Sequence, residues 1–178
     1  DHLRMISQLQ TDRGGEFTSG PEGNEKRRSV FDKYCIRRDI ARRLTSALSP
    51  NQNGRAERAN RTLFNTMRCN LMDSQMGWSH WFDAYKMGAY ARNRTPKKGG
   101  RPSAYERFYR REPGYKRMVP FGTVADIQYK KINKESLDRS VEARVIGYPD
   151  DTPGWIFEVA GARRPYVTSH ARFDRSRT

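Results

Sequence analysis

The stretch that decides the fold runs from residue 49 to residue 72 and reads SPNQNGRAERANRTLFNTMRCNLM. Its first part is polar and contains Pro50, which is typical of an irregular loop. From Arg55 to Met72 apolar residues recur three or four positions apart, which predicts a helix with one apolar face. That face consists of Leu63, Phe64, Met67 and Leu71. Glu57 stands near the start of this helix.

The residues before this stretch predict two short strands and one helix. Residues 5–10 predict a short strand with Ile6 and Leu9 as its apolar positions, and a Gly-containing turn follows, so Asp12 stands just beyond a strand end. Apolar residues at helical spacing predict a helix from Val30 to Arg37. Residues 40–44 favour a brief strand.

The residues after this stretch predict a third helix, a connector and several strands. The third helix follows Gly77, and we expect its aromatic side to lie in the core. Those side chains are Trp78, Trp81, Phe82 and Tyr85. Residues 96–122 are basic and rich in Gly and Pro, with a short helix over 104–109. Four short apolar or alternating runs between 124 and 169 then predict a small β-rich module.

Composition favours a polyanionic partner. The 178 residues include 35 Lys and Arg against 20 Asp and Glu, for a formal charge of +15. Nucleic acid is the first candidate, because every neutralised phosphate releases counterions. No apolar run is long enough to span a membrane, so we expect no membrane partner and an intracellular location, nuclear or cytoplasmic. Cys35 and Cys69 lack companions at metal-ligand spacing, and we expect both to be buried thiols.

Asp12 and Glu57 are the candidate metal ligands. A carboxylate at a strand end and another on a helix suit hard divalent cations such as Mg²⁺. Two such ions activate an attacking hydroxyl and stabilise the leaving oxygen in phosphodiester displacement. Spacing alone, however, favours the simpler interpretation of a surface Asp and a Glu stabilised by the helix dipole.

The residues around both carboxylates favour the metal-ligand interpretation over the surface one. Residues 11–17 (TDRGGEF) and 49–61 (SPNQNGRAERANR) resemble the two later catalytic blocks of copia-type retrotransposon integrases. Three later segments resemble motifs that follow the catalytic blocks of this family in the same order. They are residues 93–96 (NRTP), 102–106 (PSAYE) and 119–122 (VPFG). Residues 146–148 and 168–173 resemble the region after the catalytic core, so the resemblance covers nearly the whole chain.

This resemblance implies the fold and the chemistry. It implies an incomplete RNase H-like α/β core over residues 1–95, the basic connector over 96–122 and the β-rich extension over 123–178. The family processes the 3′ ends of element DNA and joins them to target DNA, using Mg²⁺ or Mn²⁺ held by three carboxylates. Asp12 corresponds to the second carboxylate and Glu57 to the third. The resemblance also implies a homo-oligomeric parent protein.

The resemblance also suggests residues beside the DNA. Gln52, Asn53 and Gly54 would form a loop next to bound DNA, and Arg58 and Arg61 would contact phosphates. For the two arginines, helix solubility and pairing along the helix remain an equal alternative.

Three readings of the function follow. The family's first catalytic Asp and its zinc-binding module would lie before residue 1, so we expect the chain to be inactive alone. One alternative is a catalytically dead, nonspecific DNA-binding remnant. The other is a protein-interaction module built on the β-rich extension.

Overall fold

The computed structural model describes residues 6–11, 29–44, 54–128 and 140–173. The chain forms two compact units, Asp1–Arg61 and Thr62–Thr178, and each is described by itself. No helix in the described ranges is both long and apolar enough to cross a membrane.

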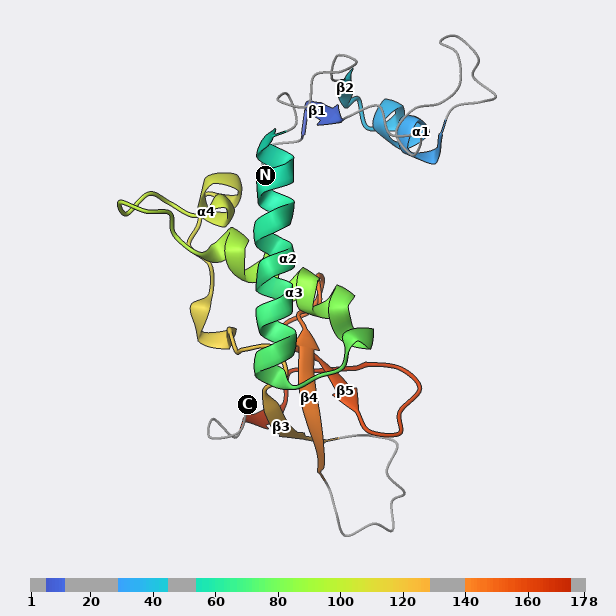
Figure 1. Cartoon of the computed structure of the whole chain (residues 1–178), viewed down its shortest axis with the longest axis vertical. Helices are drawn as coiled ribbons and strands as arrows, with labels where there is room; N and C mark the ends of the chain where they lie inside the picture. The colour runs from blue at the N-terminus through green and yellow to red at the C-terminus, as the bar shows by residue number, and fades with distance from the viewer. Residues whose placement is uncertain (1–5, 12–28, 45–53, 129–139, 174–178) are drawn as a thin grey trace. The chain divides into compact units, whose positions relative to one another are not determined.

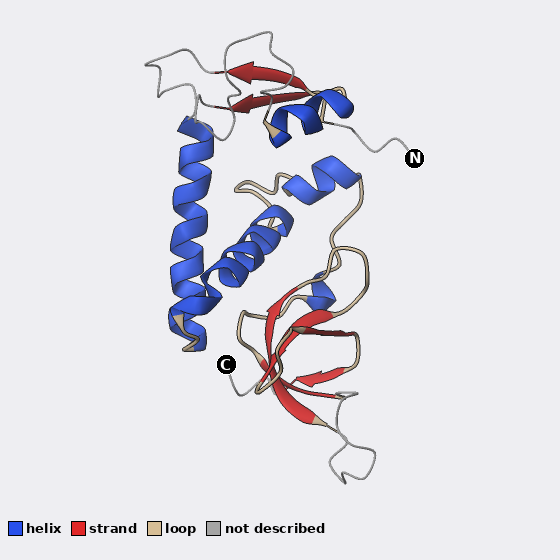
Figure 2. Ribbon diagram, turned by 90° about the vertical axis from the view of Figure 1, so that its right-hand side faces the viewer, coloured by secondary structure: helices blue, strands red, loops and turns tan. Residues whose placement is uncertain are grey.

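The first unit contains a parallel pair of strands and a crossover helix. Strand β1 (Gln8–Thr11) pairs in parallel with β2 (Ala41–Leu44), and Thr11 lies opposite Leu44. Helix α1 (Val30–Arg37) connects them, as a parallel pair requires (Figure 2). These elements confirm the expected order of strand, helix and strand.

Helix α1 begins at a sequence-encoded cap and is tied to β2. The hydroxyl of Ser29 accepts a hydrogen bond of 3.1 Å from the backbone N–H of Asp32, which satisfies one donor of the first turn. The carboxylate of Asp32 also forms an ion pair with Arg42 of β2. Cys35 is buried in this unit, as expected. Cys69 is exposed, so the expectation that both thiols are buried was wrong for Cys69.

Helix α2 spans Gly54–Ser74 and is the longest element (Figure 1). The predicted apolar face is buried at Met67 and Leu71, in the second half of the helix. Phe64, nearer the start, is 44% exposed. The division between the two units falls within this helix, after Arg61.

The second unit begins with α2 packed on α3 (Trp81–Arg94), which a single turn of 3₁₀ helix, η3 (Trp78–His80), precedes. The Asn70 side chain donates a 3.2 Å hydrogen bond to the carbonyl of Ala84. A Cβ on Gly88 would lie 3.1 Å from Thr66, so the helices approach closely at this point. Small residues on α3 therefore face α2.

This packing corrects in part the prediction that the aromatic side of the third helix forms core, because Tyr85 packs against the core but the other three residues do not. Trp78, Trp81 and Phe82 are 64%, 40% and 54% exposed. The buried positions of α3 are Ala84, Met87 and Gly88. The close approach selects small side chains for the buried face, and bulky aromatic residues lie beside it.

Five antiparallel strands complete the second unit, in the order β6-β5-β4-β3-β7. Their bounds are β3 Val124–Ile127, β4 Val141–Gly147, β5 Trp155–Val159, β6 Tyr166–Thr168 and β7 Ala171–Phe173. The first four correspond to the expected apolar runs, and the separate strand β7 was not expected. The fold is thus mixed α/β with a curled antiparallel sheet. An RNase H-like core and the boundaries at residues 95 and 122 stay predictions.

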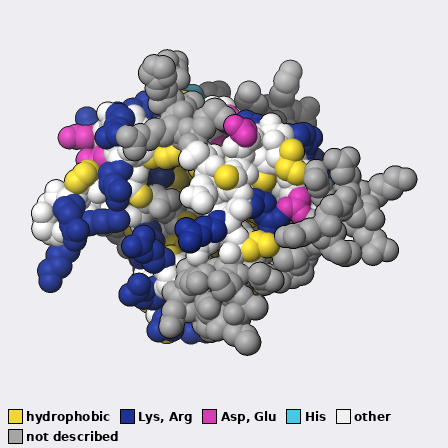
Figure 3. All heavy atoms as spheres, turned by 90° about the horizontal axis from the view of Figure 1, so that it is seen from above, with side chains coloured by type: hydrophobic (Ala, Val, Ile, Leu, Met, Phe, Trp, Pro, Cys, Tyr) yellow, Lys and Arg dark blue, Asp and Glu magenta, His cyan; other side chains and the backbone are white. Residues whose placement is uncertain are grey.

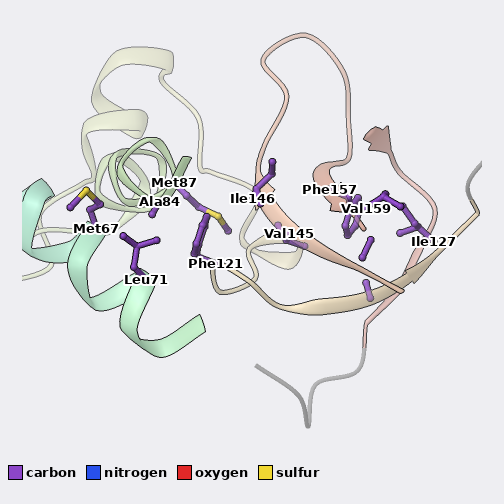
Figure 4. Packing of buried hydrophobic residues seen from close by; sticks show 12 residues of the cluster. Met67, Leu71, Ala84, Met87, Phe121, Ile127, Val145, Ile146, Phe157 and Val159 are labelled. Carbon is purple, nitrogen blue, oxygen red and sulfur yellow. The ribbon is translucent and has the colours of Figure 1, made fainter. Parts of the chain in front are cut away.

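One apolar cluster joins the sheet to the helices. Figure 4 shows Met67 and Leu71 of α2 pointing toward Met87 and Phe121, while Phe157 lies among sheet residues at the other end of the cluster. At the end of α2, Arg144 of β4 donates a 2.9 Å hydrogen bond to the carbonyl of Ser74. The sheet and the two helices therefore share a core.

Two further short helices follow α3 in the sequence and precede the strands of the sheet. Helix α4 (Ala104–Tyr109) begins with a capping box, in which Ser103 and Glu106 exchange hydrogen bonds of 2.6 and 3.2 Å. A 3₁₀ turn, η4 (Tyr115–Arg117), follows it. The expected helix over 104–109 is confirmed with the same bounds.

We predict that Gly122→Ala destabilises the protein by about 2 kcal/mol or more. Gly122 has φ of +77°, and an added Cβ would lie 2.3 Å from the Cβ of the buried Ser74. Gly114→Ala is the matched control, because φ is −77° there and no atom lies within 4 Å of the added Cβ. Denaturant unfolding measures both, and equal stability of the two variants would contradict the prediction.

We also predict an acid-sensitive cap on α4. Hydrogen bonding from the Ser103 side chain, and then from its backbone, lowers the pKa of Glu106 below its usual 4.5. A carboxyl whose pKa is lower in the folded state stabilises the fold above the unfolded-state pKa and loses this effect as pH falls. The unfolding free energy of the wild type should therefore decline relative to Glu106→Gln below about pH 4.5. Parallel curves for the two proteins would contradict this.

Candidate functional site

Glu57 lies in the first turn of α2, where its side chain is exposed. An exposed carboxylate is the kind of oxygen ligand that Mg²⁺ prefers. The role of Glu57 as a metal ligand stays a prediction.

Asp12, Gln52 and Asn53 lie outside the described residues. In the described residues before them, Thr11 of β1 lies opposite Leu44 of β2 at the ends of the two strands. Because Asp12 lies outside the described residues, its pairing with Glu57 stays a prediction. Among the described residues, no group of three His, Cys, Asp or Glu side chains is placed to hold a metal ion.

The predicted DNA-contacting arginines lie on the first two turns of α2, which begins at Gly54. Arg58 and Arg61 are both exposed. Arg58 donates a 3.2 Å hydrogen bond from Nε to the carbonyl of Gly54, four residues earlier. This bond fixes Arg58 along the helix and agrees with the structural alternative. A contact of either arginine with phosphate stays a prediction.

His80 has a structural partner in the second unit. Its Nε2 atom lies 3.3 Å from a carboxylate oxygen of Glu158 on β5, which ties η3 to the sheet.

A hollow that the sequence patterns did not indicate lies between α3, α4 and the turn after β4. Its volume is about 1010 Å³. Its aromatic lining comes from all three elements and includes Phe82, Tyr90, Tyr105, Phe108, Tyr109 and Tyr148. Lys86, Arg94, Asp150 and Asp151 add charged groups of both signs. The sequence signal was the aromatic spacing on α4, at residues 105, 108 and 109, next to basic residues.

Arg94 organises one wall of this hollow. Its guanidinium carbon lies 3.3 Å from the centre of the Tyr90 ring and 4.7 Å from that of Tyr105. Its Nη1 atom donates a 3.3 Å hydrogen bond to the carbonyl of Tyr90. Cation–π contacts of this kind hold the guanidinium in a fixed place.

Tyr148 supports the same wall from the turn after β4. Its ring stacks on Tyr90 with centroids 4.0 Å apart. Its hydroxyl donates to the carbonyl of Val119 at 3.1 Å and accepts from the N–H of Val119 at 2.9 Å. Burial raises the pKa of Tyr148, so the phenol stays neutral at physiological pH. The wall is therefore anchored by polar and aromatic contacts together.

A second hollow of about 540 Å³ adjoins the first. Both are lined by Tyr90, Arg94, Tyr105 and Tyr148, and the second adds Lys116 and Arg117. The surrounding segment is strongly basic: residues 92–117 contain ten Lys and Arg and only two Glu. Figure 3 shows Lys and Arg side chains gathered on one side of the face it views. Aromatic hollows within a basic segment are typical of sites for single-stranded nucleic acid.

Comparison with known proteins gives the family. No family model matches the chain. The chain is 31% identical over 157 residues, 85% of its length, to the retrovirus-related Pol polyprotein from transposon TNT 1-94 of Nicotiana tabacum. It is 23% identical over 171 residues to the corresponding polyproteins from transposons RE2 and RE1 of Arabidopsis thaliana. In each case the chain spans 11% of the relative's length.

One solved structure, a cryoEM structure of the simian T-cell lymphotropic virus intasome in complex with PP2A regulatory subunit B56 gamma, is weakly similar. The TM-score is 0.46 and the identity 13%, over 97% of this chain and 56% of that one. This similarity is too low to support an argument about fold or function. The sequence matches confirm the family that the motifs indicated: the chain belongs, as a segment, to the Pol polyproteins of copia-type retrotransposons.

Proposed function

We propose that this chain is the DNA-binding part of a retrotransposon integrase and carries two of its metal-ligating carboxylates. The observation that carries the proposal is the match to the tobacco polyprotein over 85% of the chain. Because the match covers 85% of the chain, it includes α2 and Glu57 whether the unmatched residues lie at the N-terminal or the C-terminal end. The chain spans only a small part of its relatives, so the activity of the whole protein is part of this proposal.

Asp12 and Glu57 would hold Mg²⁺ or Mn²⁺ in the intact protein, within an RNase H-like core. The ion would supply an acidified nucleophile and charge stabilisation for 3′-end processing and strand transfer. The residues of this chain contribute ligands and orientation. Glu57 is exposed on a rigid helix, and Asp12 directly follows the end of β1. A long helix fixes the position of a ligand better than a loop does.

The basic segment over residues 92–117 would hold the DNA. Arg110, Arg111, Lys97 and Lys98 are exposed, so phosphates can reach them. Phosphate contacts position a protein on DNA without reading its sequence. Element ends, target DNA and a homo-oligomeric assembly belong to the same proposal.

Exposed aromatic residues favour protein interaction as a second candidate function. Trp78, Trp81 and Phe82 lie near one another at the start of α3, and the Trp81 and Phe82 rings are 5.6 Å apart. Contiguous exposed apolar side chains mark interaction surfaces. Binding through this surface would depend little on salt, which distinguishes it from binding through phosphates.

We predict that duplex DNA binding depends steeply on salt and on residues of the basic segment. Each phosphate contact contributes a slope of about −0.9 to the plot of log affinity against log salt. Lys97→Gln with Lys98→Gln should make the slope shallower by roughly one to two units. Fluorescence anisotropy at several salt concentrations measures it.

The matched control changes Arg163 and Arg164 to Gln, because both are exposed and lie between β5 and β6. This control removes the same charge from another part of the second unit. If both double variants lowered the slope equally, net charge rather than the basic segment would be responsible. Binding that did not respond to salt would contradict DNA binding through phosphates.

We also predict weak Mn²⁺ binding near the start of α2, because this chain supplies two of the three carboxylates. A paramagnetic ion broadens the NMR signals of nearby amides, so Mn²⁺ should selectively weaken those of Gly54–Arg61. Glu57→Gln should abolish this effect, because it removes the charged oxygen ligand. Glu112→Gln is the control, since Glu112 is also exposed but lies in the basic segment. Broadening that persisted in Glu57→Gln would rule out Glu57 as a ligand.

A further inference from the structure

We propose that the hollow between α3, α4 and the turn after β4 binds an unpaired base of single-stranded DNA. This inference rests on the proposed DNA binding and names the form of DNA that this part of the chain takes. Nothing in the family comparison assigns a role to the hollow.

Helix α4 presents exposed aromatic rings to the hollow. Phe108 and Tyr109 line the hollow and are 40% and 46% exposed, so part of each ring is open to solvent. Neither belongs to the apolar core or packs against it. Their rings lie 4.9 Å apart at 77°, and Tyr109 also contacts Tyr105 at 4.6 Å. They support one another and leave surface on which a base can stack.

The hollow is large enough to hold a nucleobase. A volume of about 1010 Å³ lies at the upper end of the range for sites that enclose small molecules. A nucleobase with its sugar fits within that space. A base pair inside a duplex cannot enter, because its faces are covered by its neighbours and its backbone surrounds it.

The polar groups of the hollow suit the edge of a base. Arg94 and Lys86 are donors, whereas Asp150 and Asp151 are acceptors on the turn after β4. Bases present both donors and acceptors on their edges, so both kinds of group find partners. Arg94 is already fixed by Tyr90 and Tyr105, which lowers the entropy cost of using it.

The charge around the hollow supplies the backbone contacts. The adjoining hollow shares Arg94 and adds Lys116 and Arg117, so a strand leaving the first hollow meets positive charge in the second. The exposed Arg110 and Arg111 follow α4 directly. A stacking site next to a basic groove is the usual arrangement for binding a single strand. A proline-rich peptide also binds aromatic grooves but does not use this charge.

The experiment compares a single strand with a duplex. Fluorescein-labelled oligothymidylate of about 16 nucleotides, a length within the site sizes of single-strand binders, is titrated beside a duplex of equal length. The variant changes Phe108 and Tyr109 to Ala. The control is Trp78→Ala, since Trp78 is 64% exposed but lines neither hollow. Circular dichroism and thermal unfolding establish that both variants are folded.

We expect the double variant to lose about tenfold or more in affinity for the single strand, at the low end of what stacking contributes. Its affinity for the duplex should change less than about twofold, because backbone contacts remain. The control should bind both DNAs as the wild type does.

Three results would overturn the proposal. If the double variant and the control bound the single strand equally well, the hollow would not hold a base, although DNA binding itself would stand. If an oligouridylate bound at least about tenfold more tightly than the oligothymidylate, the assignment to DNA would be wrong. If a proline-rich peptide bound in the hollow and the oligothymidylate did not displace it, the ligand would be a peptide. Failure of the wild type to bind any DNA would instead refute the proposed function.

Discussion

The close approach between the end of α2 and the turn before β3 is the constraint on which the second unit depends. Ser74 is almost completely buried, and Gly122 packs against it where no side chain fits. The N–H of Gly122 donates to the carbonyl of Val145 at 2.8 Å, and Arg144 donates to the carbonyl of Ser74. Helix end, turn and strand are therefore fixed at one point. From there a single apolar cluster extends from α2 and α3 into the sheet.

Local signals in the sequence predicted the elements well because each element carries its own. Helices α1 and α4 have the expected bounds, and in both a serine caps the first turn. These caps act within three residues, so a linear reading detects them. The antiparallel strands between 124 and 168 were likewise visible as short apolar runs between turns. Strand β7 was not, because it has three residues and alternates weakly.

Which face of a helix is buried could not be predicted in the same way. Periodicity shows that aromatic residues share a side of α3, but not how closely a neighbouring helix approaches. The buried positions of α3 are Ala84, Met87 and Gly88, the last in close approach to Thr66, whereas Trp81 and Phe82 remain exposed. The same limit applies to the hollow. Tyr90, Tyr105 and Tyr148 meet only in the fold, and no pattern within one element could join them.

The sequence contains a motif for the metal site but none for the hollow. Glu57 was identified from its motif, and its exposure in the first turn of α2 agrees with the polar residues around it. Asp12, Gln52 and Asn53 lie outside the described residues, so their part of the site rests on the family resemblance. The hollow has no motif, and the proposal for it rests on the exposure, contacts, volume and charge of its lining.

Net charge overstates how many phosphates this chain can contact. Arg42 forms an ion pair with Asp32, and Arg144 bonds a carbonyl at the end of α2. Such side chains contribute to the long-range field but are already engaged by the protein. The salt dependence of binding counts phosphate contacts and not charges. Its slope should therefore correspond to the exposed cations of residues 92–117, and fall well short of the formal charge of +15.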